Sequence, residues 1–214
     1  MGAAVAVGRD LARAQARVSA PPAPPLLLAS RSPQRRAILE QLRIPFEVVP
    51  PQYDEPCVPV SDTVGEVRRR AQAKARSVAG LAAEQPVLGV DTEVVLDGRI
   101  YGKPADSAAA EQMLDELAGK THEVVSGLCL LTRAWEELRH EVTRVSFRSL
   151  TPRELGIHVA SGEWRDRAGG YAIQGLGAAL VERIEGDYLN VVGLPGALLV
   201  RLLAEHFPGV YGFG

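Results

Sequence analysis

An acidic residue, Asp91, follows a short apolar run at positions 87–90. Such a run predicts a buried strand that ends at the aspartate. In open α/β sheets the carboxyl ends of strands face the ligand crevice, where a carboxylate can bind a metal ion or take a proton from water. A lone aspartate after a strand is more often a turn residue, so this position by itself leaves both interpretations open.

Residues 29–36 join a predicted strand to the start of a predicted helix. Ser32-Pro33 is typical of an N-cap and first helical position, and the unpaired N–H groups of a first helical turn attract anions. Ser30 offers a hydroxyl, and Arg35 can bind a phosphate or carboxylate through two parallel hydrogen bonds. An ordinary capped helix with exposed arginines is the alternative. The segment lacks the glycines of a P-loop.

Two lysines could hold an anion. Lys74 lies on the apolar stripe of a helix predicted over 63–83. An ammonium group that loses water without gaining a partner costs several kcal/mol, so Lys74 must reach water or meet an anion in a cleft. Lys103 follows a predicted hairpin and is by itself more typical of a surface residue.

Two further segments carry polar groups with possible ligand roles. Asp54-Glu55 is an acidic pair, and Glu55 could hold Mg²⁺ together with Asp91 if the fold brings them together. Residues 166–175 are rich in glycine, which permits close backbone approach to a ligand. Within them, Gln174 could pair with the edge of a pyrimidine base, or cap a nearby backbone group.

The elements that must position these residues alternate between strands and helices early in the chain, while strands dominate its middle. Helices are predicted over 33–41, 63–83, 107–117, 151–160 and 196–206, and strands over 26–29, 46–49, 87–90, 124–131, 141–147 and 179–184, with a hairpin over 94–100 that turns at Asp97-Gly98. A further turn is predicted at 186–188. This pattern predicts a mixed sheet flanked by helices, an α/β fold bordering on α+β.

The 214 residues, 46% apolar and 23% charged, are typical of a soluble globular protein. Because the net charge is −2, a local cluster of cations must hold any anionic ligand. The two cysteines match no metal or redox spacing and favour a reducing, cytoplasmic compartment, and no run approaches the ~18 apolar residues of a membrane span. We expect a disordered or partly helical extension over 1–25, one domain over 26–207 and a tail over 208–214.

Several motifs, in this order, resemble those of the Maf family. The family's opening LASxSPRR is similar to residues 28–36, its G-A-D-T to residues 89–92, and its K-P pair to Lys103-Pro104. Its D-K-A-G-x-Y-G-I-Q-G motif resembles residues 166–175. The family's G-D-Y and V-V-G-L-P motifs match residues 186–195. The resemblance runs from about Leu26 to Phe207.

The resemblance implies an elongated mixed β-sheet that splits into two lobes, with a nucleotide in the cleft, and a homodimer. It implies hydrolysis of nucleoside triphosphates between the α- and β-phosphates, giving monophosphate and pyrophosphate. By this resemblance Asp91 is the general base, and Glu55 with Asp91 holds a divalent cation, Mg²⁺, Mn²⁺ or Co²⁺. The substrate-binding residues that it implies are Ser30, Gln34, Arg35, Lys74, Thr92, Lys103 and Gln174.

The family has two main branches that differ in the glycine-rich loop. The branch that prefers dTTP and UTP carries Y-G-I-Q-G, and the branch that prefers 7-methyl-GTP carries C-A-G-S-F-K-S-E-G. Residues 171–175 read Y-A-I-Q-G and place this chain with the first. Gln34 departs from the family's arginine at a position linked to base choice, so the preferred base stays open.

Three alternatives accompany this hypothesis. One is a pyrophosphatase of the 7-methyl-GTP type. Another is a regulatory nucleotide-binding protein of cell division that does not turn over its ligand. The third is a nucleic-acid-binding module built on Arg31, Arg35 and Arg36, although the chain lacks aromatic platforms and a basic stripe.

Overall fold

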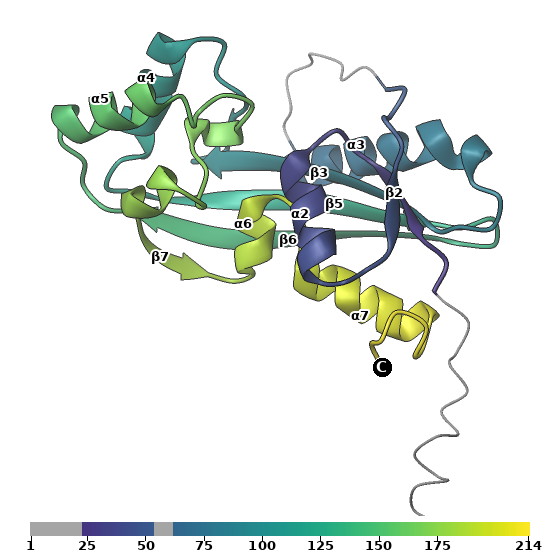
Figure 1. Ribbon diagram of the computed structural model, residues 1–214. Helices are drawn as coiled ribbons and strands as arrows, with labels where there is room; N and C mark the ends of the chain where they lie inside the picture. The colour runs from purple at the N-terminus through teal and green to yellow at the C-terminus, as the bar shows by residue number, and fades with distance from the viewer. Residues whose placement is uncertain (1–22, 54–61) are drawn as a thin grey trace, which may run out of the picture.

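A seven-stranded mixed sheet forms the centre of the computed structural model, which describes residues 23–53 and 62–214 (Figure 1). The strands lie in the order β2-β1-β3-β5-β6-β7, and β4 pairs with β3. Their bounds are β1 Leu26–Ala29, β2 Phe46–Val48, β3 Val87–Leu96, β4 Arg99–Tyr101, β5 Thr121–Leu131, β6 Glu136–Phe147 and β7 Val181–Glu185. The strand β1 is parallel to β2 and β3, and the other pairs are antiparallel. The predicted mixed α/β architecture is confirmed.

Six α-helices flank the sheet in the described residues, and local capping sets the ends of several. The helices are α2 Pro33–Gln41, α3 Thr63–Val78, α4 Ser107–Leu117, α5 Pro152–Ser161, α6 Tyr188–Val192 and α7 Gly196–His206. Short 3₁₀ turns lie at Ala79–Leu81, Ala168–Gly170 and Leu176–Leu180. Ser32 caps α2, and Thr151 with Glu154 forms a capping box on α5.

The alternation of side chains along β1 assigns the two faces of the sheet. Leu26 and Leu28 pack with α2 and α7 on one face, and Leu27 and Ala29 pack with α3 on the other. Figure 1 shows α3 and α7 on opposite sides of the sheet. A separate apolar cluster at the far end of β3, β5 and β6 packs against α4 and α5, which lie side by side.

Two glycines let α3 approach the sheet closely. A Cβ atom on Gly89 would collide with the carbonyl oxygen of Ala71, and one on Gly127 would collide with that of Val67. Both glycines lie on strands, β3 and β5, that pair beneath the helix. The absence of side chains at these two positions lets the backbone of α3 lie close to β3 and β5.

The short length of β1 leaves part of β3 open on one side. Pairing of β1 with β3 ends at Gly89, and pairing of β4 with β3 begins at Val94. Between them, residues 90–93 pair with β5 alone in the described part of the chain. The polar residues of this stretch therefore lie at an opening in the sheet.

The structure corrects several predicted boundaries. Asp91 lies in the middle of β3 and does not end it, because antiparallel pairing with β5 continues well past this residue. The carboxyl end that faces the opening belongs to β1 instead. Helix α3 ends at Val78 rather than residue 83, and the last turn becomes 3₁₀. Strands β5 and β6 begin earlier than predicted, β7 is shifted to Val181–Glu185, and the predicted turn at 186–188 leads into α6.

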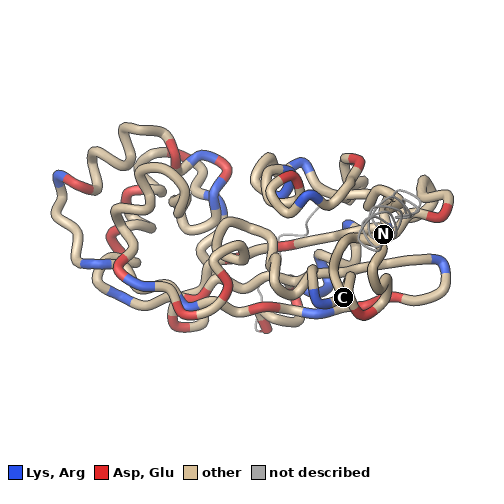
Figure 2. The backbone as a smooth tube through the Cα atoms, turned by 60° about the horizontal axis from the view of Figure 1, so that its bottom comes forward, with Lys and Arg blue, Asp and Glu red and all other residues tan. Residues whose placement is uncertain are grey.

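Charged residues of both signs are interspersed along the described backbone (Figure 2). Within the described residues no helix is long and apolar enough to span a membrane. Residues 208–214 fold back onto the core: Tyr211 is buried and donates a hydrogen bond to the carbonyl of Pro24 at 2.8 Å.

Candidate active site

A cleft of about 1130 Å³ lies at the opening in the sheet. It is lined by Asp91 and by all seven residues predicted to bind substrate: Ser30, Gln34, Arg35, Lys74, Thr92, Lys103 and Gln174. These residues come from five separate regions of the chain, and the fold brings them to one cavity. Glu55, the other predicted metal ligand, lies outside the described residues.

The carboxylate of Asp91 sits at the base of the cleft and contacts α3. Its Oδ1 accepts a hydrogen bond from Lys74 Nζ at 2.6 Å, and both side chains are largely buried, with 7% and 12% of their surface exposed. Lys74 therefore meets an anion, one of the two outcomes expected for a lysine on an apolar stripe. Its partner is a carboxylate of the protein itself.

A second pair lies one helical turn away. Arg70 NH1 donates to Glu93 Oε1 at 2.7 Å, and its Nε donates to Glu66 Oε1 at 2.7 Å. Arg70 and Lys74 are four residues apart on one face of α3, while Asp91 and Glu93 are two apart on one face of β3. The helix and strand thus meet through two parallel ion pairs. Sequence reasoning missed Arg70, although its spacing from Lys74 was a usable signal.

The guanidinium of Arg35 organises the opposite wall of the cleft. It donates to Ser30 Oγ at 3.1 Å, to Thr92 Oγ1 at 3.3 Å and to the carbonyl of Gly193 at 2.9 Å. Thr92 in turn shares a 2.8 Å hydrogen bond with Ser126, a buried residue that sequence reasoning missed. Arg35 therefore connects α2, β3 and the end of α6, and its orientation is set by hydrogen bonds.

Gln34 sits at the rim beside this network. Its Oε1 accepts a hydrogen bond from Ser32 Oγ at 3.0 Å, in the first turn of α2. Ser32 also accepts from the backbone N–H of Arg35 as the N-cap. The carboxamide of Gln34 is thus held against the helix start while it lines the cleft.

The far wall carries more exposed groups. Lys103 is 65% exposed and lies 3.6 Å from the carboxylate of Asp166. Gln174 is exposed as well, in the glycine-rich loop. Arg167 is partly buried and lines the cleft, and its Nε has no hydrogen-bond partner among the described residues. Burial lowers the pKa of Arg167. Sequence reasoning assigned it no role.

Among the described residues that line the cleft, cations outnumber carboxylates, although the chain as a whole carries a net charge of −2. The acidic lining residues are Asp91, Glu93 and Asp166, and the basic ones are Arg31, Arg35, Lys74, Lys103, Arg165 and Arg167. Three carboxylates against six cations leave an excess of three positive charges in the described part of the lining. A concave, low-dielectric site with this excess attracts a multiply charged anion.

One oxygen in the cleft suits a metal ion. Asp91 Oδ2 is buried, has no hydrogen-bond partner among the described residues, and lies 3.9 Å from Arg70 NH1. Divalent cations such as Mg²⁺ prefer carboxylate oxygens, so this atom fits a metal ligand. No cluster of three or more His, Cys, Asp or Glu suited to a metal occurs in 23–53 or 62–214. Asp91 is thus compatible with a site completed by substrate oxygens and by residues outside these ranges.

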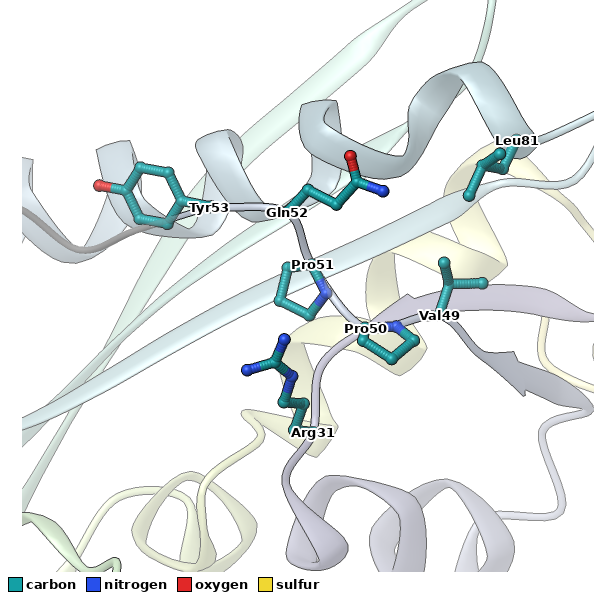
Figure 3. Close-up of a pocket in the computed structure, with 7 residues that line it drawn as sticks. All are labelled: Arg31, Val49, Pro50, Pro51, Gln52, Tyr53 and Leu81. Carbon is teal, nitrogen blue, oxygen red and sulfur yellow. The ribbon is translucent and has the colours of Figure 1, made fainter.

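A second hollow of about 650 Å³ adjoins the cleft and shares Arg31, Pro51 and Tyr53 with it. Figure 3 shows Arg31 reaching from the turn after β1 toward Pro51, with Leu81 at the other end. Val49, Pro50 and Gln52 complete its lining. The described residues that line this hollow include no carboxylate, whereas those of the larger cleft include Asp91.

A mixed α/β fold with a cation-lined cleft around a mid-strand carboxylate defines a protein suited to bind a polyphosphate anion. The chain belongs to the Maf family, since the model described as "Maf-like protein" matches residues 25–206. It is similar to the dTTP/UTP pyrophosphatase of Gloeobacter violaceus, 48% identical over 180 residues that cover 84% of this chain and 95% of that protein. The dTTP/UTP pyrophosphatase of Moorella thermoacetica is 46% identical over 189 residues, 87% of this chain and 97% of that protein. That of Nitratidesulfovibrio vulgaris is 49% identical over 182 residues, 84% and 86% respectively.

Proposed function

We propose that this protein is a nucleoside triphosphate pyrophosphatase that hydrolyses dTTP and UTP to the monophosphate and pyrophosphate. The observation that carries the proposal is the cleft itself, where an excess of cations surrounds the carboxylate of Asp91. The activity named for relatives that are 46–49% identical over most of their length agrees with this chemistry. The nucleotide would lie between two lobes, formed by the α2–α3 end and the α4–α5 end of the sheet.

Asp91 is the proposed general base. Its Oδ1 is held by Lys74, and its Oδ2 has no hydrogen-bond partner among the described residues. This second oxygen can accept a proton from a water molecule that attacks the α-phosphorus. As the new P–O bond forms, the bond from the α-phosphorus to the bridging oxygen breaks and pyrophosphate leaves.

The cations of the cleft would hold the phosphates. Arg35 and Ser30 present donors at the N-terminus of α2, and Lys103 with Arg167 approach from the far wall. The Lys74 ammonium group, which has three hydrogen-bond donors, would contact both Asp91 and the substrate phosphates. A divalent cation held by Asp91 and Glu55 would neutralise triphosphate charge when bound.

Base choice is the proposed role of three neutral residues that line the same cleft: Gln34, Thr92 and Gln174. The carboxamide of Gln174 offers one donor and one acceptor that match the O–C–N–H edge of thymine or uracil. A polar pocket matched to a base edge rejects mismatched bases strongly, because polar groups that a mismatched base covers are left unpaired.

The purified protein with Mg²⁺ and a panel of dTTP, UTP, CTP, GTP and 7-methyl-GTP tests the proposal, with monophosphate, pyrophosphate and orthophosphate resolved. We expect monophosphate and pyrophosphate from dTTP and UTP. The same products from 7-methyl-GTP alone would keep the reaction and reject the pyrimidine assignment. Binding without turnover of any nucleotide would reject the enzyme in favour of a regulatory protein.

The nucleic-acid alternative relied on three arginines, and one of them, Arg35, makes hydrogen bonds inside the cleft.

We also propose a homodimer located in the cytoplasm, as the family resemblance and the cysteine content favour. Analytical ultracentrifugation at micromolar concentration checks the dimer, which a sedimenting species of 22.9 kDa would contradict.

A further inference from the structure

Behind the glycine-rich loop, two buried polar side chains contact each other. His122 Nε2 lies 2.8 Å from the hydroxyl of Tyr171, in a hydrogen bond between β5 and the loop. Both residues are almost fully buried. Tyr171 also lines the cleft, whereas His122 lies behind it. The pair thus connects the sheet to the loop that carries Gln174.

Buried side chains alternate with more exposed ones along residues 171–174 of the loop. Tyr171 has extended backbone angles, φ −141° and ψ 159°. Tyr171 and Ile173 are buried in the apolar cluster of the α4–α5 end, whereas Ala172 is half-buried and Gln174 is exposed. Because Gln174 follows directly on these two buried side chains, the depth at which Tyr171 is held contributes to where the Gln174 backbone lies.

Other contacts hold the two ends of this loop, and the buried side chains of Tyr171 and Ile173 hold its middle. On the N-terminal side, His158 Nε2 lies 3.1 Å from the carbonyl oxygen of Gly170. On the C-terminal side, the carboxylate of Glu163 accepts hydrogen bonds from the N–H groups of Leu176 and Gly177. Among the described residues, the Tyr171 hydroxyl makes the one side-chain hydrogen bond from positions 171–174.

Core packing alone gives little reason for this pair. His122 packs edge-on against the ring of Phe147, with centroids 4.8 Å apart, and its Nδ1 has no partner among the described residues. Burial lowers the pKa of His122 to about 4 and raises that of Tyr171, so both groups are neutral near pH 7. A polar pair with an unsatisfied atom is no more stable than two apolar side chains of the same shape.

We propose that His122 and Tyr171 are positioning residues for base selection: their hydrogen bond fixes the depth of the loop and thereby the place where Gln174 meets the pyrimidine edge. The inference rests on the proposed function and on the proposed role of Gln174. Neither residue of the pair needs to touch the phosphates or the attacking water. Their loss is therefore expected to alter discrimination between bases more than the rate of phosphate cleavage.

Tyr171→Phe removes the hydroxyl and keeps the ring. We expect the ratio of kcat/KM for dTTP to kcat/KM for CTP to fall roughly tenfold, the factor expected for one hydrogen bond, mainly through KM for dTTP, with kcat for dTTP nearly unchanged. Tyr101→Phe is the matched control. Tyr101 is buried in the same apolar cluster, its hydroxyl donates to Glu116 at 2.8 Å, and it is not among the residues that line the cleft.

The proposal would be overturned if Tyr171→Phe and Tyr101→Phe gave the same ratio of kcat/KM for dTTP to kcat/KM for CTP, with similar losses of thermal stability. The pair would then have a structural role only. Two variants of the partner give a second measurement. His122→Gln can still place an amide nitrogen near the Tyr171 hydroxyl and is expected to keep more selectivity than His122→Leu. Equal selectivity in these two variants would also count against the proposal.

A double-mutant cycle separates this inference from the proposed function. Gln174→Ala alone should abolish the preference for dTTP, and adding Tyr171→Phe should lower it no further, because the tyrosine acts through Gln174. Full additivity would mean that the pair acts elsewhere. An unchanged preference in Gln174→Ala would overturn the base-recognition role and the positioning role together. Absence of dTTP turnover in the wild-type protein would reject the proposed function itself.

Discussion

Lys74 Nζ lies 2.6 Å from Asp91 Oδ1, and this ion pair connects the middle of α3 to the middle of β3. The two residues are 17 positions apart in the chain, and the contact exists because Gly89 lets the helix approach the strand. One carboxylate oxygen is thereby held by a cation, while the other remains without a hydrogen-bond partner in the described structure. Asp91 of this pair is the general base of the proposed mechanism.

Replacing Asp91 with asparagine tests that role while keeping the shape of the side chain. We expect kcat for dTTP to fall by ~10²–10⁴-fold, because a neutral amide cannot act as a general base. Circular dichroism and a nucleotide-binding assay should show a folded protein that still binds dTTP. More than about a tenth of the wild-type rate would exclude Asp91 as the general base.

Lys74→Met removes the charge and keeps most of the side-chain volume. We expect kcat/KM for dTTP to fall by about 10²-fold or more, because both Asp91 and the triphosphate lose a preorganised donor. Arg76→Met is the control on the same helix. Arg76 is exposed and paired with Glu136, away from the cleft, so its removal should leave turnover unchanged. Equal effects of the two changes would indicate a general effect of charge.

The second ion pair, Arg70 with Glu93, is expected to show strong coupling. Arg70→Leu leaves the Glu93 carboxylate buried without this partner and should lower the free energy of unfolding by about 3–5 kcal/mol. The double variant Arg70→Leu with Glu93→Val should recover at least half of this loss, since Glu66 keeps its bonds to Arg69. Urea unfolding of the wild-type protein, the two single variants and the double variant measures the coupling free energy. Additive losses would show that the pair is not a unit.

Gly89→Ala is expected to separate α3 from the sheet. The added Cβ would meet backbone atoms of Ala71 and Ala75, which cannot yield cheaply, so stability should fall by about 1–3 kcal/mol or more. Activity should fall as well, because the Lys74–Asp91 contact depends on this approach. Gly80→Ala, at a position with open space around the new Cβ, should be neutral or slightly stabilising. Similar unfolding curves for both variants would contradict the packing argument.

Stability is expected to depend on pH through His122. Burial lowers its pKa from 6.5 to about 4, so between these values the unfolded chain binds a proton that the folded protein does not. The free energy of unfolding therefore falls as pH is lowered from about 6.5 to about 4, by roughly 3 kcal/mol from this group. His122→Gln should lose this part of the slope in urea titrations at several pH values. An identical slope in the variant would assign the dependence to other groups.

Helix ends were predictable where local chemistry sets them. A serine or threonine cap followed by proline marks the starts of α2 and α5. Helix α2 begins at Pro33 as predicted, and α5 begins at Pro152, one residue after its predicted start. Strand lengths were predicted less well. Strand β3 runs on through Asp91 to Leu96 because β5 pairs with it throughout, and such a partner is not visible in a local window.

The short helix α6 was missed for a related reason. Residues 186–188 read as a turn, yet Asp187 caps α6 through Leu189 and also accepts from the N–H of Ala197 at the start of α7. Its neighbour Asn190 is buried and bonded to β5 and β6. A five-residue helix has little intrinsic stability, so these tertiary contacts decide that it forms.

The sequence by itself determined the family, the order of the motifs and the kinds of side chain available for phosphate, metal and base. It also required that Lys74, on an apolar stripe, find water or an anion. Only the tertiary structure decided that the anion is Asp91, that Arg70 makes a second pair, and that His122 lies behind the base loop. These contacts join segments far apart in the chain. They depend on strand register and on the close packing of a helix over glycine, which no local pattern of residues encodes.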